Sequence, residues 1–568
     1  MNISNFKSKA ENIHVFLAYP LLFLAGVMQT FAICSPLDAQ TRGWLQVGCL
    51  ALMIYLLEDS QKSVHSAVKQ IRNIQDSRIF IKKAFIYSAV FSISWLATTF
   101  WWIYISLHKY GGLPSLLAVG AVLILATGLS IYYAVVCTIY SQLYKPLGWA
   151  LSSFLFGCLW TLADLARAQW FTGFPWAAIG YAHLDNPMKL LAPYVGVYGI
   201  GLAAAALACM LSKILGALKT SFTQQESTNK LTWRNGVIAA VLMVVLWPNQ
   251  VVIEKIETIK DERVAFSKEL SYTLLQGNVA QEIKFEAEGL SALRWYENQI
   301  MAANTQLIVT PETALPVLKR DLPKSYWDDL LRSFSQERAQ HQALLLGMVG
   351  EDPGGYTNRV VGITKGKEDY VYDKHHLVPF GEFIPAWFKW FTDLMKIPLG
   401  SFKRGSLAQT PWEIEGQRIA INICYEDVFG EELAQSFILD PRAVPTMMVN
   451  VSNIGWFGTF WAVEQHLNAS RMRAIEMQRP VLRATNTGAT AAIDHNGYVI
   501  AMLPKGEVGV LKGSIRGVTG SPTPYAQWSG AYSLYPLWGL CLTVLAAVLW
   551  RRLFQDKKSE YGTNENTE

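Results

Sequence analysis

Long stretches of apolar residues fill the first half of the chain and limit what it can fold into. A helix needs about 20 such residues to cross about 30 Å of hydrocarbon, and eight stretches qualify as candidate spans, the second and fifth rather short. Their approximate ranges are 15–34, 44–57, 84–107, 116–140, 149–165, 190–215, 236–252 and 534–554. The first is read as a retained helix rather than a signal peptide, because six further spans follow it and no clear small-x-small cleavage site ends it. We therefore expect a polytopic α-helical membrane domain.

The charged residues divide the chain into two parts. Residues 1–254 hold 26 of the 93 charged side chains, whereas the remaining 314 residues hold 67, the usual share for a soluble domain. This contrast excludes a disordered, collagen-like or fully cytosolic chain, and a net charge of +5 is too small and too scattered for nucleic-acid binding. We expect a membrane domain with seven transmembrane helices at 1–254, a folded domain at 255–532, and a C-terminal transmembrane helix with a cytoplasmic tail at 533–568.

Lysine and arginine residues near the span ends predict the orientation, because such residues gather on the cytoplasmic side. With the N-terminus in the cytoplasm, seventeen of them lie inside, and only Arg42, Lys109, Arg167 and Lys189 lie outside. Seven crossings then place the folded domain outside the cytoplasm. In a bacterium with two membranes that compartment is the periplasm, and both termini are cytoplasmic.

The cysteines single out one thiol. Six of the seven fall within or at the ends of the spans, where cysteine behaves as a small apolar residue. Cys424 stands alone in the folded domain, with no partner for a disulfide and no second ligand for a metal. On this fact alone it is either a buried inert thiol or a reactive group.

The folded domain alternates short strands with helices. Strand-type runs lie at 272–276, 307–310, 343–348, 360–364, 370–372, 419–424 and 446–451. Helical spacing is found at 286–303, 324–340, 431–439 and 461–477. This alternation predicts a layered α/β domain whose functional side chains lie just past strand ends.

Three strand ends carry charged or reactive groups, namely Glu312, Lys374 and Cys424. A thiol is a weak nucleophile until a base takes its proton, and a nearby cation favours the thiolate. Glu312 can be that base, while Lys374 and the backbone N–H of Tyr425 can stabilise an oxyanion. Taken singly, the ordinary interpretation is a solvated surface lysine for Lys374 and a capping or turn residue for Glu312. Their coincidence at three strand ends favours a nucleophilic site.

At these residues the sequence resembles the nitrilase superfamily, which uses a Glu-Lys-Cys triad on an αββα sandwich. The motifs are TPETALP around Glu312, KHHLVPFGEFIP from Lys374, CYEDVF from Cys424, NVSNIGWFG from Asn450 and RATNTGATAAID from Arg483. Behind seven spans and ahead of one, and with TGFPW at 172–176, the chain resembles the membrane-embedded apolipoprotein N-acyltransferase family in particular.

This resemblance implies a ping-pong acyl transfer at the outer face of the bacterial inner membrane. The Cys424 thiol would take an acyl chain from a phospholipid, typically phosphatidylethanolamine, as a thioester. The α-amino group of the diacylglyceryl-cysteine of an apolipoprotein would then accept it, in the last step of lipoprotein maturation. We expect a monomer that uses no cofactor, metal or nucleic acid.

Three residues match supporting positions of the family. Glu382 resembles a second glutamate that orients or assists the triad, and Tyr425 and Glu426 match positions beside the nucleophile. Their ordinary alternatives are an ion pair for Glu382, ring packing for Tyr425 and helix capping for Glu426.

The remaining candidate site residues belong to one loop and to two positions that depart from the family pattern. Trp456, Phe457 and Gly458 are predicted to form a mobile or membrane-facing loop near the substrate entrance, although aromatic residues in loops are as often local packing. Phe285 stands where the family has a tryptophan, so an apolar contact survives there. Ile454 replaces the aspartate of an SND motif, so a polar contact is lost.

Two other classes of function remain open at this point. A membrane-tethered amidase or hydrolase would resolve the thioester with water, and the triad alone does not separate it from an acyltransferase. A non-enzymatic binding or transport component would not need an intact triad. His375 and His376 follow Lys374 but, as neighbours on a strand, would point to opposite faces, and His466 has no obvious cluster around it.

Overall fold

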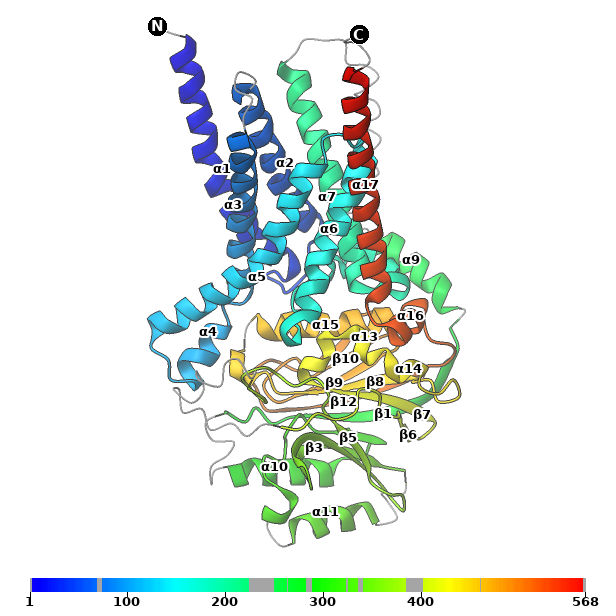
Figure 1. Cartoon of the computed structure of the whole chain (residues 1–568). Coiled ribbons are helices and arrows are strands. Elements are labelled where there is room, and N and C mark those ends of the chain that lie inside the picture. Colours follow the sequence, from blue (N-terminus) through cyan, green and yellow to red (C-terminus); the bar gives the residue numbers. More distant parts are fainter. Residues whose placement is uncertain are drawn as a thin grey trace.

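The computed structural model places a bundle of long helices on top of an α/β sandwich (Figure 1). It describes residues 3–68, 74–223, 250–262, 264–281, 289–322, 325–335, 341–384, 402–459 and 461–564. The bundle consists of α1 (Ile3–Ile33), α2 (Gly43–Val68), α3 (Ile74–Thr99), α5 (Ser115–Leu143), α6 (Trp149–Gln169), α7 (Ala192–Thr223) and α17 (Tyr535–Asn564). Helix α1 begins, and α17 ends, at the end of the bundle farthest from the sheets (Figure 1).

Five helices within the described residues are long and apolar enough to cross a membrane. They are Arg78–Thr99, Ser115–Leu143, Trp149–Thr172, Pro187–Lys219 and Tyr535–Phe554, and Leu17–Ile33 is a shorter apolar helix. All six overlap predicted spans, and the predicted span 44–57 lies within α2. The span 236–252 falls outside the described residues except for its last three, which open α9 (Gln250–Asp261). The total of eight spans and the boundaries at 254 and 532 stay predictions.

The third predicted span ends earlier than its hydropathy indicates. Helix α3 stops at Thr99 instead of continuing to residue 107, and the chain turns through α4 (Ile103–Ile105) and the π-helical segment η1 (Ser106–Tyr110). Trp102, in this turn, donates from Nε1 to Oε1 of Gln465 at 3.2 Å. A contact with the α/β part therefore competes with continuation of the apolar helix.

Two six-stranded sheets form the sandwich, in the orders β12-β1-β2-β3-β4-β5 and β11-β10-β9-β8-β7-β6. The first contains β1 (Phe266–Gln276), β2 (Leu307–Val309), β3 (Ala343–Asp352), β4 (Gly355–Thr364), β5 (Tyr370–Asp373) and β12 (Gly509–Val518). The second contains β6 (Trp412–Ile414), β7 (Gln417–Ile423), β8 (Met447–Ser452), β9 (Val481–Thr485), β10 (Ala491–Ile493) and β11 (Val499–Met502). Strands β1 to β3 and β7 to β9 pair in parallel, and the other pairs are antiparallel.

Helices cover both outer faces of the sandwich (Figure 1). Helices α10 (Gly289–Ala302) and α11 (Tyr326–Ser335) lie beneath the first sheet, on the side away from the bundle. Between the second sheet and the bundle lie α13 (Gly430–Leu433), α14 (Gln435–Ile438), α15 (Ala462–Met477) and α16 (Pro524–Tyr532). The predicted αββα sandwich behind a helical membrane part is confirmed. Strands β6 and β9 to β12 have no predicted counterpart. Three of them, β6, β10 and β11, have only three or four residues, β9 has a charged arginine at its centre, and in β12 exposed charged residues interrupt the apolar ones.

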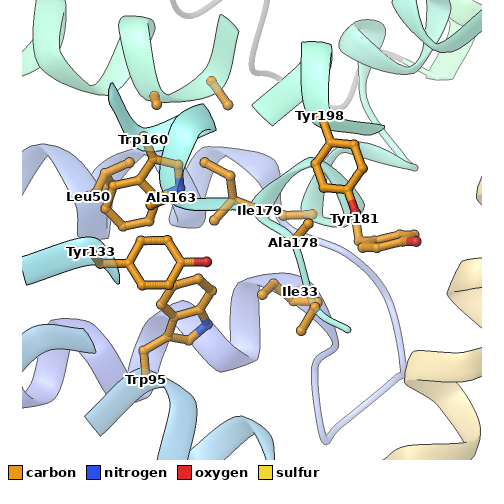
Figure 2. Packing of buried hydrophobic residues seen from close by; sticks show 14 of the residues in the cluster. Ile33, Leu50, Trp95, Tyr133, Trp160, Ala163, Ala178, Ile179, Tyr181 and Tyr198 are labelled. Atoms are coloured by element: carbon orange, nitrogen blue, oxygen red, sulfur yellow. The ribbon is translucent and has the colours of Figure 1, made fainter. Parts of the chain in front are cut away.

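The bundle and the sandwich share one apolar core. Figure 2 shows part of it, with Trp95, Tyr133 and Trp160 packed together within the bundle. The same cluster continues into the sandwich through residues beside Cys424 and along α15, including Tyr425 and Phe429. Separate clusters fill the space between the sheets and behind each of them. The end of β7 therefore lies where the sandwich meets the bundle.

Candidate active site

Cys424 lies at this junction, directly after β7 and as the first residue of the short 3-10 helix η8 (Cys424–Val428). Its φ of +54° falls in the left-handed region, which is uncommon for a residue with a side chain. It is the only one of the seven cysteines that is half-buried, since the other six are fully buried. The sharp turn thus places a half-buried cysteine at the strand end, as expected for a nucleophile.

Lys374 follows β5 and is only 1% exposed, with two carboxylates around its ammonium group. Nζ donates to Oε1 of Glu382 at 2.9 Å and to Oε1 of Glu312 at 3.3 Å. Asn358 of β4 donates from Nδ2 to the same two oxygens, at 2.7 Å each. The structure thus brings Glu312, Lys374 and Glu382 together, and the three carry a net charge of −1 when all are ionised.

The environment of the thiol opposes its ionisation. Burial, and then the negative charge of Glu312, raise the pKa of Cys424 to about 12, although the positive charge of Lys374 acts in the other direction. Burial also disfavours the charged form of Lys374, but Glu312 and Glu382 together raise its pKa above the usual value. At neutral pH the amine is therefore charged and the thiol protonated, so Cys424 needs a base before its sulfur can act as a nucleophile.

Glu426 links the lysine segment to the nucleophile strand. Its carboxylate accepts hydrogen bonds from the backbone N–H groups of Ile423, His375 and His376 and from the hydroxyl of Tyr372. Burial raises the pKa of Glu426 to about 7, against the effect of these backbone donors. The Glu426 side chain therefore connects the segment after Lys374 to the end of β7. This role is more than the helix cap expected as its ordinary alternative.

Tyr425 contacts the membrane part through the motif TGFPW. Its hydroxyl donates to the carbonyl oxygen of Gly173 at 3.3 Å, and its ring stacks on Trp176 with centroids 6.2 Å apart. Nearby, Nε2 of His376 lies 3.1 Å from the carbonyl oxygen of Thr172. A loop between membrane helices therefore lies directly against residues that flank the lysine and the thiol.

A buried arginine shapes this loop. Arg167, near the end of α6, is 1% exposed and donates from Nη1 to the carbonyl oxygens of Phe174 at 2.8 Å and Trp176 at 2.7 Å. Gly173 has φ +80°, and a Cβ there would lie 2.1 Å from the carbonyl oxygen of Ala168. Arg167 falls in a predicted outer connection, and its structural role had no signal in the sequence because its partners are backbone carbonyl oxygens.

The predicted entrance loop packs on the bundle. The ring of Trp456, 37% exposed, lies 5.3 Å from that of Tyr110, and the ring of Phe457 lies 4.5 Å from that of Trp102. Gly458 has φ +80°. These contacts agree with local packing against membrane-part residues, and a role in substrate entry stays a prediction.

The two departures from the family pattern have different outcomes. Ile454 is 2% exposed and belongs to the apolar core shared with the bundle, so the polar contact expected of an aspartate is replaced by apolar packing. Phe285 lies outside the described residues.

Three polar residues beside Glu312, Lys374 and Cys424 were not among the predicted site residues. Besides Asn358, they are Asn450 and His466, whose side chains lie 3.4 Å and 2.9 Å from the carbonyl oxygen of Cys424. Asn358 and Asn450 stand out only as amides within largely buried strands. His466 carries no signal in its own helix because its partner Arg483 comes from β9.

Comparison with known proteins matches both parts of the chain. Residues 25–210 match the apolipoprotein N-acyltransferase N-terminal domain, and residues 274–525 match the carbon-nitrogen hydrolase family. An apolipoprotein N-acyltransferase of Verminephrobacter eiseniae is 43% identical over 91% of this chain and 93% of the relative. One of Ralstonia nicotianae is 38% identical over 94% of each chain.

Among solved structures, a CN-hydrolase superfamily protein of Xanthomonas campestris is similar over 47% of this chain and 96% of its own, with 18% identity and a TM-score of 0.34. The matches to the two family domains and to the full-length relatives confirm the resemblance found in the sequence. The chain belongs to the apolipoprotein N-acyltransferase family.

Proposed function

We propose that this protein moves an acyl chain from a phospholipid, through a thioester on Cys424, to the α-amino group of the diacylglyceryl-cysteine of an apolipoprotein. As a member of its family the chain is a membrane-bound acyltransferase of lipoprotein biosynthesis. The observation that carries the finer proposal is the position of the thiol. Cys424 lies within the electrostatic reach of Glu312 and Lys374 and beside a loop of the membrane part.

In the first half-reaction the Cys424 thiol attacks the ester carbonyl carbon of the phospholipid while Glu312 takes its proton. Lys374 and the N–H of Tyr425 stabilise the oxyanion of the tetrahedral intermediate. The carbon–oxygen bond to glycerol then breaks, and the glycerol oxygen receives the proton from Glu312. The products are a lysophospholipid and the thioester.

In the second half-reaction the amine of the apolipoprotein attacks the thioester carbonyl carbon. Glu312 takes a proton from the attacking nitrogen, the carbon–sulfur bond breaks, and the proton passes to the departing sulfur of Cys424. The product is an amide, and the free thiol is restored. One carboxylate serves both steps because each needs a base first and an acid afterwards.

The location and the donor also belong to this proposal. The bias of lysine and arginine residues supports a periplasmic sandwich with cytoplasmic termini, and α1 and α17 reach the same end of the bundle (Figure 1). Phosphatidylethanolamine as the donor and a monomer as the active form follow from the family resemblance. The three-part division at residues 254 and 532 completes the proposed organisation.

The test is to incubate the purified protein with phosphatidylethanolamine vesicles and measure a hydroxylamine-sensitive acyl adduct on the Cys424 peptide by mass spectrometry. A diacylated lipopeptide is then added, and the acyl chain is expected to move to its amine. Cys424→Ala should form no adduct, with Cys541→Ala as the matched control. Glu312→Gln should slow adduct formation by about 100-fold or more, with the exposed Glu413→Gln as the control.

Two other outcomes would contradict the proposal. An adduct that only water removes, with no transfer to the lipopeptide, would make the protein a hydrolase. The absence of any adduct from the unmodified protein would reject the thioester route.

A further inference from the structure

We infer that His466 is a positioning residue that aims the oxyanion-stabilising N–H of Tyr425 by holding the carbonyl oxygen of Cys424. The inference rests on the proposed function, because it needs Cys424 as the nucleophile. It assigns a task to a histidine that is 1% exposed and lies outside the Glu-Lys-Cys triad.

One peptide bond joins the carbonyl group of Cys424 to the N–H of Tyr425. The carbonyl group of one residue and the N–H of the next lie in one plane and point in opposite directions. Fixing the oxygen therefore fixes the direction of the N–H. Nε2 of His466 lies 2.9 Å from this oxygen, and Nδ2 of Asn450 lies 3.4 Å from it.

The turn at Cys424 requires contacts that fix its backbone. Cys424 has φ +54°, a conformation that persists in residues with a side chain only where the surroundings impose it. Hydrogen bonds to its carbonyl oxygen from α15 and β8 supply that constraint from two different elements.

The tautomer of His466 is set from its other ring nitrogen. Nη2 of Arg483 lies 2.5 Å from Nδ1, and a guanidinium can only donate, so Nδ1 accepts and Nε2 carries the hydrogen. Burial, and then the charge of Arg483, hold the pKa of His466 well below its usual value, which keeps the ring neutral. The ring therefore donates to Cys424 and is not available as a base.

Arg483 is itself held in place. Its Nη1 lies 3.2 Å from Oδ2 of Asp427 and 2.7 Å from Oγ of Ser470. A second constraint on the His466 ring comes from the membrane part. The ring of Trp176 stacks on it, with centroids 5.4 Å apart and planes 17° apart. The imidazole is thus fixed at its edge by β9 and on its face by the loop between membrane helices.

A test follows from two reactions in which the sulfur of Cys424 is the nucleophile. Acyl transfer passes through an oxyanion in both half-reactions, whereas alkylation by iodoacetamide forms none. His466→Phe keeps a flat ring but removes the donor, so kcat should fall by about 100-fold, the scale of one lost oxyanion donor. KM and the alkylation rate of Cys424 should change less than about twofold, because neither depends on stabilisation of an oxyanion by the N–H of Tyr425.

Two further variants complete the experiment. His466→Gln restores an N–H donor without the ring and should return kcat to within about tenfold of the unmodified protein. His495 lies in the same domain but is hydrogen-bonded to Asp261. His495→Phe is therefore the matched control and should behave as the unmodified protein.

The outcomes separate this inference from the proposed function. An equal loss of alkylation and turnover in His466→Phe, or full turnover by it, overturns the positioning role. If His466→Phe does not fold, the kcat of His466→Gln decides, and a loss greater than tenfold overturns the role. A missing acyl adduct in the unmodified protein would instead reject the proposed function.

Discussion

The ammonium nitrogen of Lys374 lies 2.9 Å from Oε1 of Glu382, closer than the 3.3 Å that separates it from Oε1 of Glu312. Oε2 of Glu382 also accepts the backbone N–H of Val378 at 2.8 Å, which fixes the carboxylate in place. Glu382 and Glu312 therefore share the positive charge of Lys374, and both raise its pKa. Lys374 thus has a second carboxylate partner besides Glu312.

Glu382→Gln should slow thioester formation by about 10- to 100-fold, because Lys374 would then pair with Glu312 alone and weaken it as a base. The measurement is the single-turnover rate of acyl-adduct formation, with thermal unfolding recorded alongside. Glu413→Gln, which changes an exposed carboxylate in β6, controls for the loss of charge. A Glu382→Gln rate equal to that of the unmodified protein would show that Glu382 has no influence on the base.

The thiol of Cys424 should react in a way that reflects its raised pKa. With that pKa at about 12, the rate of iodoacetamide alkylation without substrate should keep rising between pH 7 and pH 10. Lys374→Met removes the positive charge that lowers the thiol pKa, so its alkylation at pH 9 should be slower. A plateau below pH 9 in the unmodified protein would mean that the free site already holds a thiolate.

Trp176 should be needed for activity although it belongs to the membrane part. Its Nε1 donates to Oε1 of Gln465 at 2.7 Å, and its ring contacts both Tyr425 and His466. Trp176→Leu keeps an apolar side chain but loses these contacts, so turnover should fall by about tenfold or more. Trp170→Leu is the control, since Trp170 is 54% exposed. Equal activity of both variants would show that the loop does not position the site.

Glu431 should make stability depend on pH. Burial, and then the charge of Glu432, raise its pKa to about 8, and its Oε2 has no hydrogen-bond partner within the described residues. Between about pH 4.3 and pH 8 the unfolded chain releases this proton while the folded chain keeps it. The free energy of unfolding therefore falls as pH rises, by up to about 1.4 kcal/mol per pH unit from this group.

Glu431→Gln removes this titration. The Tm of the variant relative to the unmodified protein should therefore increase from pH 5 to pH 8, as measured by thermal unfolding in the same detergent. Unfolding curves that shift in parallel with pH would show that Glu431 is already ionised in the folded state. Glu413→Gln, at an exposed position, should leave the pH dependence unchanged.

Much of the architecture was predictable because it depends on local patterns. Apolar length identifies the spans, and short apolar runs identify β1 to β5, β7 and β8. Glu312, Lys374 and Cys424 follow such runs, so their meeting at strand ends could be proposed from the sequence. Short strands such as β10, with three residues, carry too little pattern to be recognised.

The contacts that complete the site join residues that are remote in the chain. Asn358 and Glu312 are 46 positions apart, His466 and Cys424 are 42 apart, and Tyr425 and Gly173 are 252 apart. A hydrogen bond depends on distance and direction in space, which hydropathy and spacing along the chain do not encode. Only the packing of the bundle against the sandwich brings the loop after α6 close to Cys424. This packing makes the membrane part a component of the candidate site.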